Sequence, residues 1–417
     1  MDKPFVFVLF GATGDLAVKK IFPALQALCR EGALGGDPRI IATGRRDWND
    51  EGFASFLRQG GTFDDGFVSK VSYVKIDVDA GTGYAELADK IAGNAEGAIF
   101  YSSLAPNFHA PVAQGLHDVG LISRGRGKLL IEKPFGTDEK SAKSLDRVLE
   151  GFLDEGQIFR VDHYLGKDTL RAVMDLHEST PELARLISNE SVESIRVALF
   201  EEKGIDGRGA SYDGMGAFRD VGQNHILEAL AVIAAEPSVR AASWQSARAK
   251  ALKRLAPPAK TCELSRRGQY EGYGNEKGVD PGSETETAFE VVTCFRSGKL
   301  KGVPVTLVSG KRMPSSGSFA EISFKEISGI PRKMVFRIQP EQEIVIESCD
   351  GSRESFDIPR TRDAYGNVIL AATRGTERAF AGSDEVRALW AYADRVVACW
   401  NKVPLERYGP GKPFLVE

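Results

Sequence analysis

The apolar run Phe5-Val6-Phe7-Val8-Leu9-Phe10 leads directly into Gly11-Ala12-Thr13-Gly14-Asp15-Leu16-Ala17, and this junction decides the fold of the first part of the chain. A continuous apolar run of this length is typical of a strand that is buried on both faces of a parallel sheet. Glycines after such a strand let backbone N–H groups approach a pyrophosphate at the positive N-terminus of the next helix. The spacing is G-x-x-G-x-x-A rather than G-x-G-x-x-G, and a glycine-rich turn can also be a turn and nothing more.

The second predicted strand, Arg39 to Thr43, ends at Gly44-Arg45-Arg46 and favours a dinucleotide site. A dinucleotide fold that prefers NAD places Asp or Glu near this point, where the carboxylate binds the ribose 2′-hydroxyl. Arginine accommodates the 2′-phosphate of NADP instead, through charge-assisted hydrogen bonds. The sequence therefore predicts NADP, with NAD as a weaker alternative. Arg45 is the better candidate because it is closer to the strand, and two surface arginines in a loop are the alternative interpretation.

Two further strands, Ser72 to Ile76 and Gly97 to Tyr101, continue the predicted parallel sheet. The second of them leads into a turn of small residues that ends in Pro106. Doubly wound sheets bind ligands at this carboxyl end of their strands. His109 lies just beyond the turn, and we expect it on a helix surface rather than in catalysis.

A strand from Lys128 to Ile131 ends in Glu132-Lys133-Pro134-Phe135-Gly136. A lysine at the carboxyl edge of a strand is expected to point into the crevice between cofactor and substrate; a lysine that only begins a loop is the alternative. A helix from Thr137 to Glu155 follows. We place the domain boundary after Arg160, so that residues 1–160 form a Rossmann-like, doubly wound dinucleotide-binding domain.

The next segment, Arg160-Val161-Asp162-His163-Tyr164-Leu165-Gly166-Lys167, is rich in polar and ionisable side chains. If it opens a helix, His163 and Lys167 lie four residues apart on one face and form an anion site. Asp162 can accept the ring N–H of a histidine from elsewhere and so orient that histidine as a base. A solvated helix start with a capping aspartate is the alternative.

Residues 161–417 are predicted to form an α+β domain for substrate binding and dimerisation, with a large antiparallel sheet. A helical stretch from Leu170 to Leu186 precedes a series of strand patterns. Two glycine-rich segments, Gly204 to Gly216 and Arg266 to Gly282, are expected to be loops, and the second is long enough to be functional or to cover an interface. The predicted strands are Ser194 to Phe200, Ala288 to Phe295, Val303 to Val308, Ala320 to Lys325, Met334 to Ile338 and Glu343 to Glu347.

Between these strands, Phe218-Arg219-Asp220-Val221-Gly222-Gln223-Asn224-His225 precedes an apolar helix that is expected to reach Ala235. Polar side chains at the start of such a helix cost desolvation free energy unless they have partners. His225 is therefore the candidate for the base that Asp162 would orient. A capping or core histidine is the alternative.

Composition excludes several classes of function. The net charge is −4, 42% of the residues are hydrophobic and no long Lys/Arg block occurs, so we expect neither a nucleic-acid partner nor a membrane partner. The run Arg248 to Arg254 is predicted to be the solvated face of an amphipathic helix. Five widely spaced cysteines without C-x-x-C predict reduced, mostly buried thiols and no metal site. Because no signal-like or membrane-spanning apolar run occurs, a cytoplasmic location is expected.

Together these motifs resemble the glucose-6-phosphate dehydrogenase family, and the resemblance covers nearly the whole chain. The resemblance implies oxidation of the C1 hemiacetal of glucose 6-phosphate to 6-phosphogluconolactone with hydride transfer to NADP, at the start of the pentose phosphate or Entner–Doudoroff pathway. It rests on GATGDLA at Gly11, EKPFG at Glu132, RVDHYLGK at Arg160, RDVGQNH at Arg219, SGK at Ser309, FRIQP at Phe336 and DAY at Asp363.

The resemblance also implies a set of site residues. In catalysis, His225 would remove the O1 proton and Asp162 would stabilise the resulting imidazolium. His163, Tyr164 and Lys167 would hold the phosphate, and Lys133 would contact both ligands. The implied substrate-binding residues are Lys133, His163, Tyr164, Lys167, Glu201, Asp220 and Lys311. The implied cofactor-binding residues are Gly11, Thr13, Gly14, Asp15, Leu16, Arg45, Pro106 and Lys133.

Two features depart from the family pattern. Ser316 stands where a second basic residue is usual, so one contact is either lost or supplied by Arg312. The chain is also short at its C-terminus, which puts an additional NADP site in doubt. The rival hypotheses are a dehydrogenase of another sugar, sugar phosphate or cyclitol, and a non-catalytic NADP-binding regulator. A large sheet with one face uncovered by helices predicts a homodimer or homotetramer.

Overall fold

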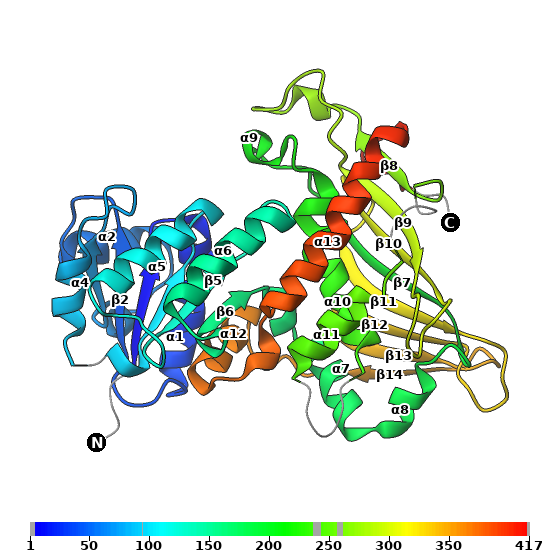
Figure 1. The fold of residues 1–417 in the computed structure, drawn as a ribbon, viewed down its shortest axis with the longest axis horizontal. Helices are drawn as coiled ribbons and strands as arrows, with labels where there is room; N and C mark the ends of the chain where they lie inside the picture. Colours follow the sequence, from blue (N-terminus) through cyan, green and yellow to red (C-terminus); the bar gives the residue numbers. More distant parts are fainter. Residues whose placement is uncertain (1–4, 94, 237–242, 257–261, 415–417) are drawn as a thin grey trace. The chain divides into compact units, whose positions relative to one another are not determined.

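The computed structural model describes residues 5–93, 95–236, 243–256 and 262–414 (Figure 1). The chain divides into two compact units, residues 1–166 with 362–386, and residues 167–361 with 387–417. We predicted a domain boundary after Arg160. The chain first passes from one unit to the other a few residues later, between Gly166 and Lys167. Residues 362–386 were expected in the second domain but belong to the first unit, because their helix packs on the helices of that unit.

The first unit contains a parallel sheet of six strands in the order β3-β2-β1-β4-β5-β6. This order reverses between β1 and β4, and doubly wound sheets bind their ligands at such a switch point. Buried apolar side chains predominate in each strand, as the sequence predicts for a sheet covered on both faces. The strands are β1 Val6–Phe10, β2 Arg39–Gly44, β3 Val71–Lys75, β4 Ile99–Ser102, β5 Lys128–Glu132 and β6 Ile158–Val161.

Helices connect these strands, and one helix from late in the chain joins them. Helix α12 (Ala364–Arg374) packs against α1, and its Tyr365, Val368 and Ile369 belong to the same apolar core as Phe7 and Leu9 of β1. The helical elements of the first unit are η1 Ala17–Ile21, α1 Phe22–Arg30, α2 Asp50–Gly60, α3 Asp65–Val68, α4 Tyr84–Ile91, η2 Ala95–Gly97, η3 Pro106–Phe108, α5 His109–Asp118, α6 Glu139–Phe152, η4 Glu155–Gln157, η5 His163–Gly166, α12 and η8 Glu377–Ala379.

A buried arginine fixes the end of β6. The Arg160 guanidinium is fully buried, donates to Asp146 Oδ1 at 2.7 Å and forms a two-pronged pair with the Glu155 carboxylate. Ser383 donates its hydroxyl hydrogen to the same Asp146 carboxylate. A buried charge requires such partners. Arg160 therefore anchors the strand from which the polar motif emerges.

The second unit contains a sheet of nine strands in the order β14-β13-β12-β11-β7-β10-β9-β8-β15. Most neighbours are antiparallel, as predicted, but β7 pairs with β10 in parallel, and so does β8 with β15. The strands are β7 Val192–Glu201, β8 Arg266–Tyr270, β9 Ala288–Cys294, β10 Pro304–Lys311, β11 Gly317–Phe324, β12 Lys333–Gln339, β13 Glu343–Glu347, β14 Arg353–Asp357 and β15 Leu405–Tyr408.

Helices of the second unit pack on this sheet, with η6 contacting β7 and β10, and α7 contacting β12 (Figure 1). Helix α13 (Ser383–Cys399) begins in the first unit and ends in the second. The other helical elements are α7 Asp168–Ser179, α8 Pro181–Leu186, α9 Gly209–Tyr212, the π-helix η6 Phe218–Ile226, α10 Leu227–Ala234, α11 Trp244–Lys253, η7 Tyr273–Asn275 and η9 Trp400–Lys402.

Three local predictions were wrong. Arg248, expected on a solvated helix face, is fully buried with Glu228 beside it. His109, expected on a helix surface, is also fully buried. The segment predicted as a loop from Arg266 begins with strand β8, because its backbone pairs with β9 and β15. In each case a tertiary partner from a distant part of the chain overrides the local pattern.

The prediction of reduced cysteines was wrong for two of the five. Cys262 and Cys399 form a disulfide across 137 residues of sequence, with their Cα atoms 5.4 Å apart. Cys262 precedes β8 and Cys399 ends α13, and the fold brings these two segments together. No local spacing motif predicts a disulfide between cysteines so far apart in the sequence. Cys29, Cys294 and Cys349 are free thiols, and Cys349 is exposed.

Within the described part of the chain, no helix combines the length and the apolar character that crossing a bilayer requires.

Candidate functional site

The glycine turn of the first unit borders a cavity of about 290 Å³. Gly11 has φ +79°, and a Cβ there would crowd Leu104 and Ser103, so only glycine fits this close approach. The cavity is lined by Gly11, Thr13, Gly14 and Arg45 from the predicted cofactor set, together with residues that include Thr43, Asp79, Ser103 and Phe108. Its position at the strand-order switch, with a glycine cradle, fits a dinucleotide. Asp15, Leu16, Pro106 and Lys133 do not line it.

The two arginines after β2 have different surroundings. Arg45 lines the cavity, whereas the Arg46 guanidinium lies 4.6 Å from the ring centroid of Trp48 and 5.7 Å from that of Phe56. The Arg46 carbonyl accepts a hydrogen bond from the Tyr73 hydroxyl at 2.9 Å. Arg46 is therefore engaged in packing, and Arg45 is the arginine placed to meet a ligand in the cavity.

A buried polar cluster lies at the carboxyl end of β5. The Glu132 carboxylate accepts a hydrogen bond from Tyr101, and the Glu132 carbonyl lies 2.9 Å from His109 Nε2. Burial raises the pKa of Glu132 to about 7, opposed by the Tyr101 hydrogen bond and the Lys133 charge. Burial also lowers the pKa of His109 to about 4, so its ring is neutral at pH 7. The residue before Lys133 is thus held by both its side chain and its backbone.

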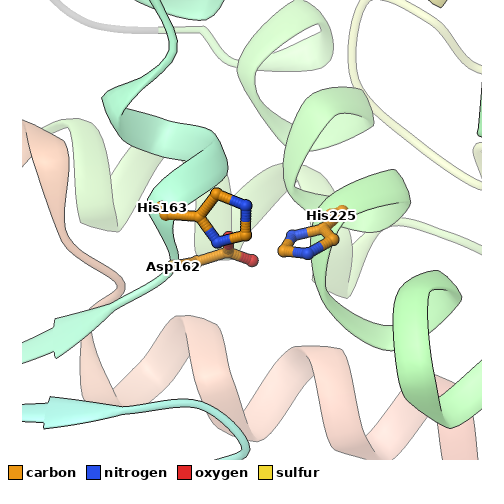
Figure 2. Close-up of side chains that lie close together, drawn as sticks. All are labelled: Asp162, His163 and His225. Carbon is orange, nitrogen blue, oxygen red and sulfur yellow. The ribbon is translucent and has the colours of Figure 1, made fainter. Parts of the chain in front are cut away.

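The polar motif leaves β6 as a tight turn. Asp162 is buried, and its Oδ1 accepts from the Tyr164 backbone N–H at 2.9 Å. The His163 ring stacks on the Tyr365 ring with centroids 5.5 Å apart. Burial raises the pKa of Tyr365 well above its usual range, and the nearby Glu132 and Asp162 charges raise it further, so this hydroxyl stays protonated. Figure 2 shows Asp162 and His163 on this turn.

His163 and Lys167 would share a helix face only if the motif opened one helix, and that condition is not met. His163 belongs to the single 3₁₀ turn η5, which ends at Gly166. Lys167 has extended backbone angles and is the N-cap residue of α7 in the second unit. Its ammonium donates to Gln339 Oε1 on β12 at 3.1 Å. The first turn of α7 is fixed to the same strand, since Thr169 donates to the Arg337 carbonyl at 2.8 Å.

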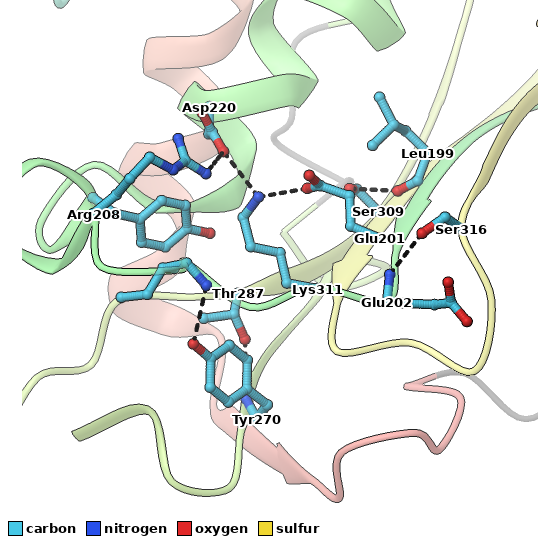
Figure 3. A network of polar contacts seen from close by, with 12 residues as sticks. Leu199, Glu201, Glu202, Arg208, Asp220, Tyr270, Thr287, Ser309, Lys311 and Ser316 are labelled. Atoms are coloured by element: carbon cyan, nitrogen blue, oxygen red, sulfur yellow. Dashed lines mark hydrogen bonds and ion pairs between the residues drawn. The ribbon is translucent and has the colours of Figure 1, made fainter. Parts of the chain in front are cut away.

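The second unit holds a buried lysine between two carboxylates (Figure 3). Lys311 Nζ lies 2.5 Å from Glu201 Oε2 and 3.1 Å from Asp220 Oδ2, and only 2% of the lysine side chain is exposed. Glu201 and Lys311 are paired residues at the carboxyl ends of the parallel strands β7 and β10. Asp220 comes from the first turn of η6. Three predicted substrate-binding residues are therefore brought together by two strands and one helix.

Arg208 is a fourth charge in this network. Its Nη2 donates to Asp220 Oδ2 at 3.5 Å, and nearly half of its side chain is exposed. Burial lowers the pKa of Arg208, but the negative charge and hydrogen bond of Asp220 outweigh burial and raise it overall. Two carboxylates and two cations leave the network close to neutral. Such a network offers both donors and acceptors to the hydroxyl groups of a sugar.

Ser316 and Arg312 have structural partners on the neighbouring turn. Ser316 Oγ accepts from the Glu202 backbone N–H at 2.9 Å and so closes the turn beside Glu201 (Figure 3). Arg312 has φ +57°, and its guanidinium pairs with Glu276 at 3.5 Å and lies over the Tyr270 ring. Arg312 therefore braces the glycine-rich segment after β8.

His225, labelled in Figure 2, belongs to the π-helix η6. It follows Asp220 by about one turn of this helix. Its backbone N–H donates to Asn224 Oδ1 at 2.7 Å, and Asn224 in turn donates to the Asp220 carbonyl at 3.0 Å. Short π-helical stretches occur frequently at functional sites because they shift the register of side chains. The sequence indicated the polar residues of this helix but not its π geometry.

Three residues of these clusters were missed as individual candidates. Tyr365 stacks on His163, Gln339 accepts from Lys167, and Arg208 pairs with Asp220. The first two lie within the motifs DAY and FRIQP, whose presence was noted without a role for any residue. Arg208 lies in a glycine-rich segment that carried no other signal.

Comparisons with known proteins place these features in one family. Residues 8–172 match the model of the glucose-6-phosphate dehydrogenase NAD binding domain, and residues 180–413 match that of the glucose-6-phosphate dehydrogenase C-terminal domain. Glucose-6-phosphate 1-dehydrogenase of Helicobacter pylori strain J99 is 32% identical over 419 residues, which cover 97% of this chain and 96% of the relative.

Solved structures agree with the sequence comparisons. Glucose-6-phosphate 1-dehydrogenase from Mycobacterium avium superposes with a TM-score of 0.87 at 30% identity, covering 98% of this chain and 94% of the other. A glucose-6-phosphate dehydrogenase in complex with its substrate glucose 6-phosphate also gives a TM-score of 0.87, at 27% identity, covering 99% of this chain and 96% of the other. The parallel sheet, the buried lysine network and both domain matches lead to one conclusion: the chain belongs to the glucose-6-phosphate dehydrogenase family.

Proposed function

We propose that the protein oxidises C1 of glucose 6-phosphate to 6-phosphogluconolactone and reduces NADP to NADPH. The observation that carries this proposal is the Lys311–Glu201–Asp220 network, within a chain matched across both domains by the family. A related structure holds glucose 6-phosphate as its substrate. The reaction would supply the pentose phosphate pathway. The cytoplasmic location expected from the sequence remains a prediction, which cell fractionation would test.

The chemistry needs a base at O1 of the sugar. We infer that the neutral His225 imidazole accepts the O1 proton as the C1–H bond breaks and its electron pair leaves as hydride. NADP, when bound, accepts that hydride at its nicotinamide ring. The Asp162 carboxylate would orient the ring and stabilise the imidazolium that forms. Asn224 supports this role because it fixes the His225 backbone.

Different side chains would bind the sugar hydroxyls and the phosphate. Glu201, Asp220 and Lys311 are proposed to bind sugar hydroxyls, since carboxylates accept and an ammonium donates hydrogen bonds. His163, Tyr164 and Lys167 are proposed to bind the phosphate. Lys133 would bridge the sugar and the cofactor. With Ser316 and Arg312 already engaged on their own turn, we infer that the usual second basic contact is absent.

The cofactor proposal depends on Arg45. Gly11, Thr13 and Gly14 would approach the pyrophosphate, and Arg45 would pair with the 2′-phosphate at the other side of the same cavity. Asp15, Leu16 and Pro106 remain predicted members of this site, next to its lining residues in the chain.

We also propose a homodimer or homotetramer. Phe319 on β11, Val335 on β12 and Val345 on β13 are only partly buried, although all are apolar. They alternate with the buried Ala320, Phe336 and Ile344, so they share the opposite face of the sheet. Sedimentation equilibrium should return a multiple of the 45.3 kDa chain mass, and Phe319→Asp should reduce it. A parent that sediments at the mass of one chain would contradict this proposal.

A spectrophotometric NADPH assay tests the substrate. The parent should reduce NADP with glucose 6-phosphate, and Lys167→Ala should weaken this reaction by roughly 1.5–3 kcal/mol in kcat/KM, the scale of a hydrogen bond to a charged group. Turnover of unphosphorylated glucose should change little. Lys253→Ala on α11 is the control for loss of a lysine elsewhere in the same unit. An equal loss of activity with both sugars would show that Lys167 does not bind the phosphate. If the parent bound NADP but turned over no aldose phosphate, a non-catalytic regulator would be favoured.

The base is tested by His225→Asn. Asparagine keeps polarity and comparable size but cannot accept the proton near neutral pH, so kcat should fall by about 10² or more while KM for glucose 6-phosphate is mostly retained. The kcat/KM of the parent should decrease on the acid side as the imidazole protonates, and the residual activity of the variant should lack that limb. Asp162→Asn should reduce kcat less. If the activity of His225→Asn stayed within a few-fold of the parent, His225 would not be the general base. Lys133 would then be the next candidate for that role.

Cofactor choice is tested by a pair of neighbouring variants. Arg45→Ala should raise KM for NADP far more than KM for NAD, because only NADP loses a charge-assisted hydrogen bond. Arg46→Ala is the matched control, since Arg46 packs on Trp48, and it should affect the two cofactors alike. Equal effects of Arg45→Ala on NADP and NAD would remove Arg45 from the 2′-phosphate site.

A further inference from the structure

The segment Glu286-Thr287, directly before β9, touches both halves of the sugar network, although neither residue is part of the proposed site. Glu286 contacts the first turn of η6, which carries Asp220 and leads to His225. Thr287 contacts the backbone of Lys311. One dipeptide therefore links the helix side and the strand side of the network.

Glu286 caps the start of the helix. Its Oε1 accepts from the Phe218 backbone N–H at 3.1 Å, and its main-chain carbonyl accepts from the Ala217 N–H at 3.0 Å. Such N–H groups have no partner within a helix and must be satisfied from outside. The Phe218 ring is held as well, because it packs edge-on against Phe289 of β9 with centroids 4.8 Å apart. The first residue of η6 is thus fixed through both backbone and ring.

The loop before η6 is shaped around the same carboxylate. Gly216 has φ +80°, and a Cβ at this position would overlap the Glu286 carboxylate. The Tyr212 hydroxyl donates to the Glu286 carbonyl at 3.2 Å, and the Tyr212 ring lies 5.4 Å from Lys311 Nζ. The Glu286 carbonyl therefore also fixes Tyr212, whose ring packs beside the Lys311 ammonium.

Thr287 completes the link on the strand side. Its carbonyl accepts from the Lys311 backbone N–H at 3.0 Å. Its hydroxyl lies 2.8 Å from the Tyr408 hydroxyl, which in turn donates to the Lys311 carbonyl at 2.7 Å. The backbone of Lys311 is therefore held on both its N–H and its C=O by contacts that begin at Thr287.

The Glu286 carboxyl group is buried, and burial raises its pKa to about 7, against the opposing effects of the Phe218 N–H and the charges of Arg219 and Arg267. A buried carboxyl group costs desolvation free energy, which a glutamate used only to fill space would not justify. The positive end of a helix offsets part of that cost.

We propose that Glu286 is a positioning residue that sets Asp220 against Lys311 through the first turn of η6. Glu286 is not among the residues proposed to contact substrate or cofactor, and its effect on glucose 6-phosphate rests on the proposed function. Loss of the cap should displace Asp220 while leaving the cofactor cavity of the first unit unchanged.

Three substitutions separate geometry from charge. Glu286→Gln keeps an acceptor at the Oε1 position, Glu286→Asp keeps the charge but withdraws it by one methylene, and Glu286→Ala removes both. We expect Glu286→Ala and Glu286→Asp to raise KM for glucose 6-phosphate about tenfold, the equivalent of one charge-assisted hydrogen bond, with KM for NADP unchanged. Glu286→Gln should stay within about threefold of the parent, the rescue that a conservative acceptor provides.

The control removes a cap that does not serve the network. Ser243 Oγ accepts from the Ser246 N–H at the start of α11 in the same unit. Ser243→Ala should lower Tm without changing KM for either ligand. If Glu286→Ala behaved in the same way, Glu286 would have only a structural role and the inference would be overturned.

A second measurement does not depend on turnover. Hydrogen–deuterium exchange of the peptide that contains residues 217–220 should be at least about tenfold faster in Glu286→Ala than in the parent, and near the parent rate in Glu286→Gln. Unchanged exchange in Glu286→Ala would overturn the inference even if the parent were inactive. A parent that makes no NADPH from glucose 6-phosphate, with the expected exchange pattern, would instead reject the proposed function and keep the positioning role.

Discussion

The second unit depends on the burial of one ammonium group. Lys311 is almost fully removed from water, and a charge in that position is tolerated only with close partners of opposite sign. The parallel pairing of β7 with β10 supplies Glu201 directly beside it, in a sheet whose other pairings are mostly antiparallel. An antiparallel neighbour would end at the opposite edge and could not present its last side chain there. The exceptional pairing is therefore what makes the buried lysine possible.

In the first unit, the shape of the backbone rather than a buried charge determines the cavity. The Gly11 turn lies at the reversal of strand order between β1 and β4, beside the cavity lined by Gly11, Thr13 and Gly14 just before the first helix. Arg45 contributes a positive side chain to that lining, while Arg46 is taken up by Trp48 and Phe56. The buried strands β1, β2 and β4 end at this cavity, and most of the residues that line it lie on the turns just after them. This arrangement separates stability, which the buried strands provide, from recognition.

Much of this could be predicted from the sequence, because the decisive patterns are local. The apolar run at Phe5, the glycine turn and the alternation in β9 to β13 each follow from neighbouring residues. What failed depends on contacts between distant residues: the place of α12 in the first core, the disulfide of Cys262 with Cys399, and the burial of His109 and Arg248. The candidate site residues show the same contrast between local patterns and contacts made in the folded chain. Motifs located Lys311 and Asp220, and the family resemblance implied Glu201, but Gln339 and Tyr365 became candidates only through their contacts with Lys167 and His163.

The family pattern led us to expect a basic residue where Ser316 stands, and the charge balance around Lys311 explains why the local fold does not need one. Glu201 and Asp220 carry two negative charges, and Lys311 and Arg208 carry two positive charges, so the cluster is already compensated. A further cation at position 316 would have to find its own counterion in a turn whose Arg312 already uses Glu276. Serine instead closes that turn by accepting from the Glu202 N–H. The turn therefore needs no cation at position 316 for its own stability, so a basic residue there would serve ligand binding rather than the local fold.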